Sequence, residues 1–379
     1  RTSALQLIKF QHCHDRRGRS SRSLSSSMNP LYGRLPTDAA IVAHNEDYLV
    51  GTIGLSQAKL RRNTTRKILT LENGVLEERV NWLKRRLHLK KNEINKMIQS
   101  QPGILGQRSD VALTPKLDYL KTRLVLDEKS LRKIILGAPF ILGSSTQESV
   151  IPKLDYLQKK LLLDEASLRK IILVAPNTLG FSIEGSIEPK LDWLQNRLVL
   201  DDEKLAKVIM RFPTILQYSI DDNIEPKLDW LKQRLDLDDM AVSKIVRQFP
   251  TILGLSIPNK LEPTLAWLQQ RLSLTDRELS NLVQKIPALF GYSVGTNIEP
   301  TLNFFIEALG DEDRALALLV RSPDLFSKSL EKRLKPRLEE ARNAGLVIDD
   351  ACLKRIGKYA EKKWLTSLHY QIRQLAMGR

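Results

Sequence analysis

The sequence predicts an all-α fold, a solenoid of about seven repeats of 37 residues, each made of two helices and a short third element. Three observations carry this prediction. Two series of prolines keep one period, leucines recur at helical spacing after one series, and an aspartate recurs before a second apolar segment. A chain of 379 residues is long for one compact core, so extension by repetition suits its length.

The two proline series have seven members each, separated by 37 residues five times and then once by 36. The series stay 13 residues apart throughout. Such constant spacing over seven units indicates internal repetition. The first series is Pro115, Pro152, Pro189, Pro226, Pro263, Pro300 and Pro336; the second is Pro102, Pro139, Pro176, Pro213, Pro250, Pro287 and Pro323.

Each proline of the first series begins an amphipathic segment, which is clearest over residues 189–200. Leu191, Leu194 and Leu198 fall at i, i+3 and i+7, on one face of a helix. Proline suits the first helical turn, where its missing N–H would have no partner. An aromatic residue recurs with the same period, which favours packing in the core over stacking on bases: Trp82, Tyr119, Tyr156, Trp193, Trp230, Trp267 and Phe304.

A Leu-x-Leu-Asp corner follows the first helix, as at residues 198–201. Its aspartate is a natural N-cap for a second helix, which buries residues such as Leu205, Val208 and Ile209. The second helix ends at the second-series proline, which cannot continue it. A short apolar turn such as residues 214–216 leaves room for a third, very short helix. One unit cannot bury its leucines alone, so we expect the units to stack.

The two ends of the chain differ from the repeats. We predict a disordered organelle transit peptide at residues 1–30, a linker that is basic towards its end at 31–74, repeats at 75–340 and a C-terminal helical cap at 341–379. Residues 1–27 carry six bases, one acid and seven serines, which is the composition of a transit peptide, although a disordered basic tail would share it. In the last complete repeat, Gly310 and Asp311 replace the Leu-Asp corner, as expected of an end unit.

Composition narrows the class of partner. Lys and Arg outnumber Asp and Glu by 60 to 44, and the formal net charge of +16 favours a polyanion such as nucleic acid, with an anionic membrane surface second. The cysteines are Cys13 and Cys352, so no disulfide framework is implied, and a reducing or organellar compartment fits. No apolar run of the sequence reaches the length of a membrane-spanning helix.

The period, the paired prolines and the pattern Pro-x-Leu-x-x-Leu…Leu-x-Leu…Pro-x-x-Leu resemble the mitochondrial transcription termination factor (mTERF) family over roughly residues 75–370. Residues 329–337 are similar to the characteristic C-terminal motif of that family, and residues 359–365 to its closing segment, with Trp364 where phenylalanine is common. The resemblance implies a curved, left-handed superhelical solenoid that binds nucleic acid in mitochondria or plastids. It also implies a role in organellar transcription termination or gene expression, without choosing among such roles.

Charge is unevenly distributed along the chain. Residues 55–99 carry 12 bases and 4 acids and residues 328–379 carry 13 and 6, whereas residues 100–327 carry 28 bases and 30 acids. A nucleic-acid surface in the middle therefore requires bases and acids to lie on different faces. Bases gather late in the second helices, where they would form a periodic track for a phosphate backbone, although cations there also complement the helix dipole: Lys133, Lys170, Lys207, Arg211, Lys244, Arg247, Lys285 and Arg321.

A further candidate patch lies in the C-terminal motif, at Arg333, Lys335 and Arg337. Arginine suits phosphate because its planar guanidinium makes paired hydrogen bonds. Arg337 also matches the Pro-Arg of the mTERF motif and is our first choice among single residues. Pairing of Arg337 with a neighbouring acid at the cap is the structural alternative.

Motifs of enzymes and metal sites are absent from the sequence. No Gly-x-x-x-x-Gly-Lys loop, Cys-x-x-Cys pair or His-Glu-x-x-His helix occurs, and residues 12–14 (His-Cys-His) are adjacent in a leader, where they rarely converge on one ion. An aspartate that recurs once per unit fits helix pairing or capping better than paired catalytic carboxylates: Asp118, Asp155, Asp192 and Asp229. We therefore expect no enzyme, no metal and no cofactor.

Our leading hypothesis is an organellar protein of the mTERF type that binds double-stranded DNA to regulate transcription or its termination. One alternative is an RNA-binding factor in organelle ribosome assembly or splicing. Another is a protein-binding helical scaffold, which the near-neutral middle of the chain favours. We expect a monomer in the mitochondrion or plastid, without a membrane partner.

Overall fold

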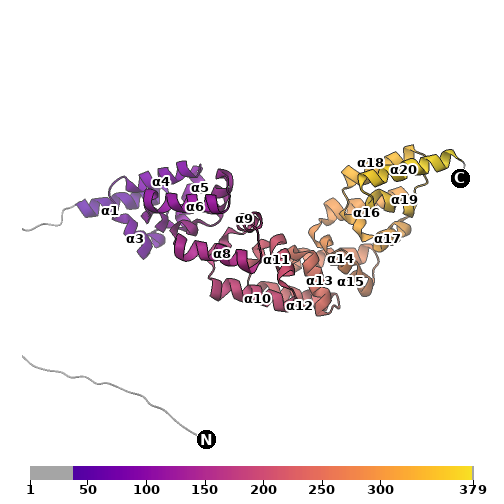
Figure 1. Cartoon of the computed structure of the whole chain (residues 1–379), viewed down its shortest axis with the longest axis horizontal. Coiled ribbons are helices and arrows are strands. Elements are labelled where there is room, and N and C mark those ends of the chain that lie inside the picture. Colours follow the sequence, from indigo (N-terminus) through magenta and orange to yellow (C-terminus); the bar gives the residue numbers. More distant parts are fainter. Residues whose placement is uncertain (1–36, 378–379) are drawn as a thin grey trace, which may run out of the picture.

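The computed structural model describes residues 37–377, and this part of the chain contains helices and no strand (Figure 1). Pairs of helices follow one another along an extended, bent stack, which confirms the predicted all-α repeat solenoid. The predicted transit peptide at residues 1–30 lies outside the described residues. Between residues 37 and 377, no helix combines the length and the apolar character that crossing a bilayer requires.

Seven units repeat one order of elements: a first helix, a second helix and a short 3₁₀ helix. The first helices of units 1 to 7 are α4 (Val75–Arg86), α6 (Thr114–Arg123), α8 (Ile151–Lys160), α10 (Glu188–Arg197), α12 (Glu225–Arg234), α14 (Glu262–Arg271) and α16 (Glu299–Leu309). The second helices are α5 (Lys91–Ser100), α7 (Glu128–Gly137), α9 (Glu165–Val174), α11 (Asp202–Arg211), α13 (Asp239–Gln248), α15 (Asp276–Lys285) and α17 (Glu312–Arg321). The 3₁₀ helices run from Pro102–Gly106 in unit 1 to Pro323–Ser327 in unit 7, and a π-helical turn such as Ile183–Ile187 leads into the next first helix.

Local sequence signals set the ends of these helices. Each second helix stops before the second-series proline, which begins the 3₁₀ helix. The second helices of units 2 to 7 begin at an N-cap whose side chain accepts a hydrogen bond from the backbone N–H three residues further on: Asp127, Asp164, Asp201, Asp238, Thr275 and Asp311. The predicted caps, helix ends and short third element are therefore confirmed.

The corner between the two helices contains a residue with left-handed backbone in every unit, and in units 1 to 6 this residue is not glycine. In unit 2, Val125 has a φ of 48°, and the N–H of Leu126 donates to the carbonyl of Lys121 at 2.8 Å, as in a Schellman cap. Unit 7 uses Gly310, with a φ of 65°. The corner thus reverses the chain so that the leucines on either side of it enter the core.

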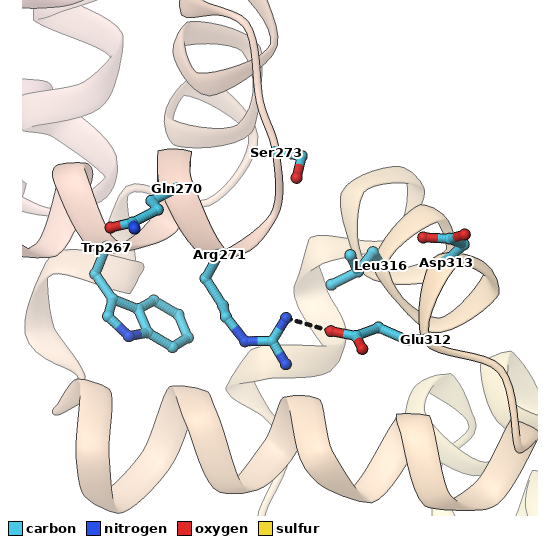
Figure 2. A pocket seen from close by; sticks show the side chains of 7 residues that line it. All are labelled: Trp267, Gln270, Arg271, Ser273, Glu312, Asp313 and Leu316. Carbon is cyan, nitrogen blue, oxygen red and sulfur yellow. Dashed lines mark hydrogen bonds and ion pairs between the residues drawn. The ribbon is translucent and has the colours of Figure 1, made fainter.

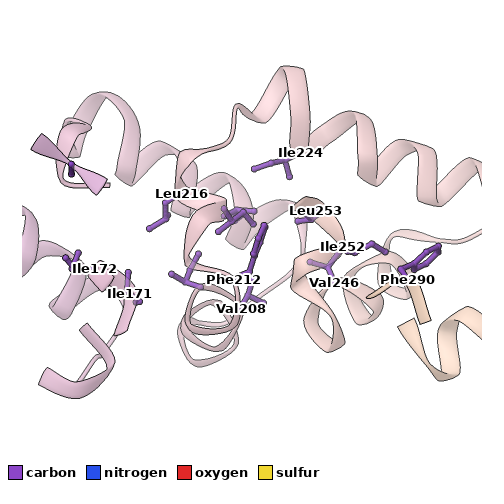
Figure 3. Close-up of a cluster of buried hydrophobic side chains, with 14 of the residues drawn as sticks. Ile171, Ile172, Val208, Phe212, Leu216, Ile224, Val246, Ile252, Leu253 and Phe290 are labelled. Carbon is purple, nitrogen blue, oxygen red and sulfur yellow. The ribbon is translucent and has the colours of Figure 1, made fainter. Parts of the chain in front are cut away.

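Apolar side chains of consecutive units pack into one continuous core. Figure 3 shows part of it, with Ile171 of unit 3, Val208 of unit 4, Val246 of unit 5 and Phe290 of unit 6 in one cluster. The recurring aromatic residues of the first helices pack against the same core, as Trp193 does, which confirms their structural role. Each unit is therefore completed by its neighbours.

The units approach one another most closely on the side of the second helices. Each of the second helices α7, α9, α11 and α13 packs on the second helix of the next unit and on the 3₁₀ helix of that next unit. Successive first helices make weaker contacts. Closer spacing on one side bends the stack, and in the middle of the chain α9 and α11 lie on the inner side of the bend (Figure 1). The inner side of the bend is therefore formed there by second helices.

Additional helices extend the stack at its two ends. Residues 31–74, which we expected to be a linker, include α1 (Thr37–Asp47), α2 (Gln57–Leu60) and α3 (Asn63–Leu69). These helices belong to the body because Leu49, Ile53 and Ile68 are buried in its core. At the other end lie α18 (Lys335–Asn343), α19 (Asp350–Lys358) and α20 (Glu361–Ala376), so residue 340, our expected boundary of the cap, falls within α18.

Candidate nucleic-acid interface

The last turn of each first helix in units 1 to 6 ends in a base that contacts the next unit. These six side chains are 19 to 32% exposed, and every one pairs with at least one acid of the following unit: Arg86, Arg123, Lys160, Arg197, Arg234 and Arg271. Arg197 is typical, since its guanidinium lies 3.0 Å from Glu225, 3.5 Å from Asp229 and 3.1 Å from Asp239. These bases hold successive units together.

The same contacts explain the aspartate that recurs once per unit. Asp118 pairs with Arg86 at 3.0 Å, Asp155 with Arg123 at 3.2 Å and Asp192 with Lys160 at 2.7 Å. The structural role predicted for these aspartates is thus confirmed as helix pairing between units. Within residues 37–377, no group of three or more His, Cys, Asp or Glu side chains is arranged to hold a metal ion.

A second set of bases lies one residue after the first-series prolines and is buried. The Nζ of Lys116 donates to the carbonyl of Leu142 at 2.6 Å, that of Lys190 to Leu216 at 2.8 Å, and that of Lys227 to Leu253 at 2.6 Å. Burial lowers the pKa of all three lysines. These ammonium groups bind the carbonyls at the end of the 3₁₀ helix of their own unit, so they stabilise the fold and are hidden from a ligand.

Arg337 belongs to this second set, because it stands one residue after Pro336. Its side chain is 5% exposed and pairs with Glu361 at 2.5 Å. Its guanidinium also donates to the carbonyls of Ile356 at 3.0 Å and Tyr359 at 2.7 Å, and it lies 5.6 Å from the ring centroid of Trp364. The structure therefore places Arg337 between α18, α19 and α20, where a phosphate has little access.

The other two residues of the predicted C-terminal patch are more accessible. Arg333 is half-buried and donates to the carbonyl of Gly357 at 3.4 Å. Lys335 is exposed and pairs with Glu331 at 2.6 Å, one turn away on the same segment. Arg333 lies in the π-helical turn Leu330–Leu334, and Lys335 is the first residue of α18, which continues the series of first helices.

The predicted bases of the second helices form a different arrangement. Lys133, Lys170, Lys207 and Lys244 are exposed and occupy the same position in α7, α9, α11 and α13, which pack side by side. Lys96, which our sequence analysis missed, is exposed at the same position of α5. We call these five residues the lysine row. Lys207 pairs with Glu203 at 2.5 Å, and the other four make no ion pair with any described residue.

The remaining predicted bases extend this row towards the C-terminal ends of the second helices. Arg211, Lys285 and Arg321 are exposed at the last residue of α11, α15 and α17. Arg211 donates to the carbonyl of Arg247 at 3.0 Å, and Arg321 lies 3.5 Å from Asp350. Arg247 itself is half-buried. The eight predicted bases therefore all lie on second helices, and three of the four that belong to the lysine row make no ion pair with a described residue.

A bent stack of helical repeats with a periodic basic row along its second helices defines a class of repeat protein suited to a long polyanionic ligand. The mTERF family model matches residues 49–364. The chain therefore belongs to the mTERF family, a family of helical-repeat proteins that bind nucleic acid, and the resemblance seen in the sequence is confirmed. Comparison with curated proteins gave no match.

Proposed function

We propose that this protein binds double-stranded DNA through the lysine row and thereby regulates transcription or its termination in a mitochondrion or plastid. The single observation that supports this proposal most is the exposure of one lysine on the second helix of each of units 1 to 5, four of them without an acidic partner among residues 37–377. A phosphate backbone is a periodic polyanion, so a periodic row of cations complements it. We expect the protein to act as a monomer without catalysis.

The spacing of the row suits a duplex. Packed helices lie about 10 Å apart, and a DNA duplex rises about 3.4 Å per base pair, so successive lysines meet the backbone about every three base pairs. Five lysines then cover about 40 Å, or roughly 12 base pairs. The row is thus long enough to follow one backbone over about a full turn of the duplex.

The composition of the second helices favours the duplex over unpaired nucleotides. Proteins that bind single strands stack bases on exposed aromatic side chains. The second helices of units 1 to 7, from α5 to α17, contain no aromatic residue. The recurring aromatics lie on the first helices and pack against the core. This surface therefore offers cations without stacking partners.

The direct test is equilibrium binding of the full chain to three labelled probes: a mixed-sequence DNA duplex of about 30 base pairs, the corresponding single strand, and a structured RNA. We expect the duplex to bind most tightly, with a logarithmic salt slope of about −4 to −5 if the five lysines neutralise one phosphate each. Absence of salt-sensitive binding to every probe would refute the proposal. Tighter binding of the RNA would favour the alternative role in organelle ribosome assembly or splicing.

A further inference from the structure

The second helices pack less closely between units 6 and 7, as they also do between units 1 and 2. Packing between α15 and α17 is weaker than between the second helices from α7 to α15. Two cavities lie at this junction, of about 570 and 460 Å³, and they share Ser273, Asp313 and Leu316 in their walls. The two cavities therefore adjoin each other, and we call them together the groove; Figure 2 shows the first of them.

One position in the wall of the groove differs between unit 7 and earlier units. In unit 3, Arg169 donates to the carbonyl of Val125 in the preceding corner at 3.1 Å. In unit 5, Ser243 occupies the corresponding position and donates to Leu198. The corresponding residue of unit 7 is Leu316, whose side chain carries no hydrogen-bond donor and is half-buried. Unit 7 thus has a larger apolar side chain at a position that carries a polar link in units 3 and 5 and alanine in unit 4.

Apolar and acidic side chains line this opening. Leu316 and Val320 on α17 are half-buried and form apolar parts of its wall. Glu278 on α15 and Asp313 on α17 are exposed, and neither makes an ion pair with a described residue. At one end Arg271 pairs with Glu312 at 2.5 Å, as Figure 2 shows, and at the other Arg321 lies 3.5 Å from Asp350. The unpaired charges of the lining are therefore negative.

We propose that this groove binds a segment of a partner protein, with an apolar side chain over Leu316 and Val320 and a lysine or arginine between Glu278 and Asp313. Charge complementarity identifies the chemistry of the partner: the two acids repel a phosphate backbone and attract a basic polypeptide. The lysine row also has no member here, because Asn281 and Ala317 occupy its positions in α15 and α17. The groove is thus a second surface, separate from the lysine row.

A synthetic peptide tests this proposal on the full chain. The probe is a fluorescent amphipathic helix of leucines and lysines, compared with the same peptide in which glutamate replaces every lysine. We expect saturable binding of the lysine peptide and none of the glutamate peptide. The double variant Glu278→Gln, Asp313→Asn should weaken binding on the order of tenfold, since it removes two exposed ion pairs with the peptide. Its affinity for duplex DNA should not decrease.

The matched control is the double variant Asp202→Asn, Glu203→Gln in unit 4. These acids correspond in the repeat to Glu312 and Asp313, and they lie at a junction where the second helices are closely packed. The control should bind the lysine peptide as the unaltered protein does. An equal loss in the control, an unchanged affinity in the groove variant, or no binding of the lysine peptide at all would each overturn the proposal.

Discussion

The bases at the ends of the first helices and those of the lysine row recur with the same period, yet their surroundings differ. Arg197 on α10 is 20% exposed and lies among three acids of the next unit. Lys170 on α9 is exposed and has no acidic partner in the described part of the chain. In units 1 to 5 the repeat thus places two cations in each unit, one that joins the units and one that faces solvent.

This difference shows why the charge count alone is a poor guide to a ligand. Residues 100–327 are nearly neutral overall, but many of their acids are paired with first-helix bases at the junctions between units. The lysine row keeps its charge because its members lie away from those acids. Variants of each set should therefore separate stability from nucleic-acid binding.

The largest effect on stability is expected for Arg337, the most buried of the bases named above. Arg337→Ala removes the partner of Glu361 and of the carbonyls of Ile356 and Tyr359. Loss of such a buried, charged donor should lower the free energy of unfolding by about 3 kcal/mol, measured by urea denaturation. Arg333→Ala, which removes only a hydrogen bond of 3.4 Å, should cost less than about 1 kcal/mol.

DNA affinity of the same variants decides between the two interpretations of the C-terminal motif. If folded Arg337→Ala keeps its affinity for duplex DNA, Arg337 is a structural residue. If its affinity falls while its stability is unchanged, Arg337 contacts phosphate and our interpretation of its burial is wrong.

The next largest effect is expected on DNA binding, from variants of the lysine row. Replacing Lys133, Lys170 and Lys244 by glutamine should weaken duplex binding on the order of a hundredfold in moderate salt and make the logarithmic salt slope shallower by nearly 3, because three phosphate contacts are lost. Thermal stability should hardly change, because these side chains are exposed and have no ion pair within the described range.

The control for this variant removes the same charge from the first helices, through Lys121→Gln, Lys159→Gln and Lys232→Gln. We expect it to retain most of its affinity for DNA. An equal loss of affinity in the two triple variants would mean that net charge matters and that the row does not, and the proposed interface would then be abandoned.

A smaller effect on stability is expected for Arg197→Ala, which leaves three acids of the next unit without their shared cation. The site is partly exposed, so we expect a loss of about 1 to 2 kcal/mol in the free energy of unfolding, between the values for surface and buried pairs. Lys207→Ala removes the fully solvated pair with Glu203 and should cost at most about 0.5 kcal/mol. Equal losses for the two variants would show that the first-helix base does not join the units.

Much of the fold could be predicted because its signals are local and periodic. Pro189 starts a helix, Leu191 faces the core and Asp201 caps the next helix, and each acts within a few residues of its position. The helices of residues 37–69 were not foreseen, since that segment lies outside the proline register and its burial depends on contacts with unit 1.

The register explains two features of the candidate site, the place of Lys96 in the row and the burial of Arg337. Lys96 stands 37 residues before Lys133, but its unit lacks the leading proline, so its place in the row was overlooked. Arg337 follows Pro336 as Lys116 follows Pro115, and this correspondence already marked a buried donor. The groove between α15 and α17 was beyond prediction, because it depends on how closely two helices pack.

The smallest effect is expected from acid, which should weaken the contacts between units before it affects the lysine row. Hydrogen bonds from Lys232 and Arg197 lower the pKa of Asp239, and Lys121 and Arg86 lower that of Glu128. A carboxyl whose pKa is lower in the folded than in the unfolded state stabilises the fold above its unfolded pKa, and this contribution is lost as the pH falls through the folded value. The urea concentration at the midpoint of unfolding should thus stay nearly constant from pH 7 to about 5 and should decrease at pH values below about 4.

Duplex affinity should be equal at pH 7 and 5, because lysines remain charged throughout this range. A midpoint that did not change down to pH 3, or a large loss of affinity between pH 7 and 5, would contradict the assignment of acids to the junctions and of free lysines to the ligand.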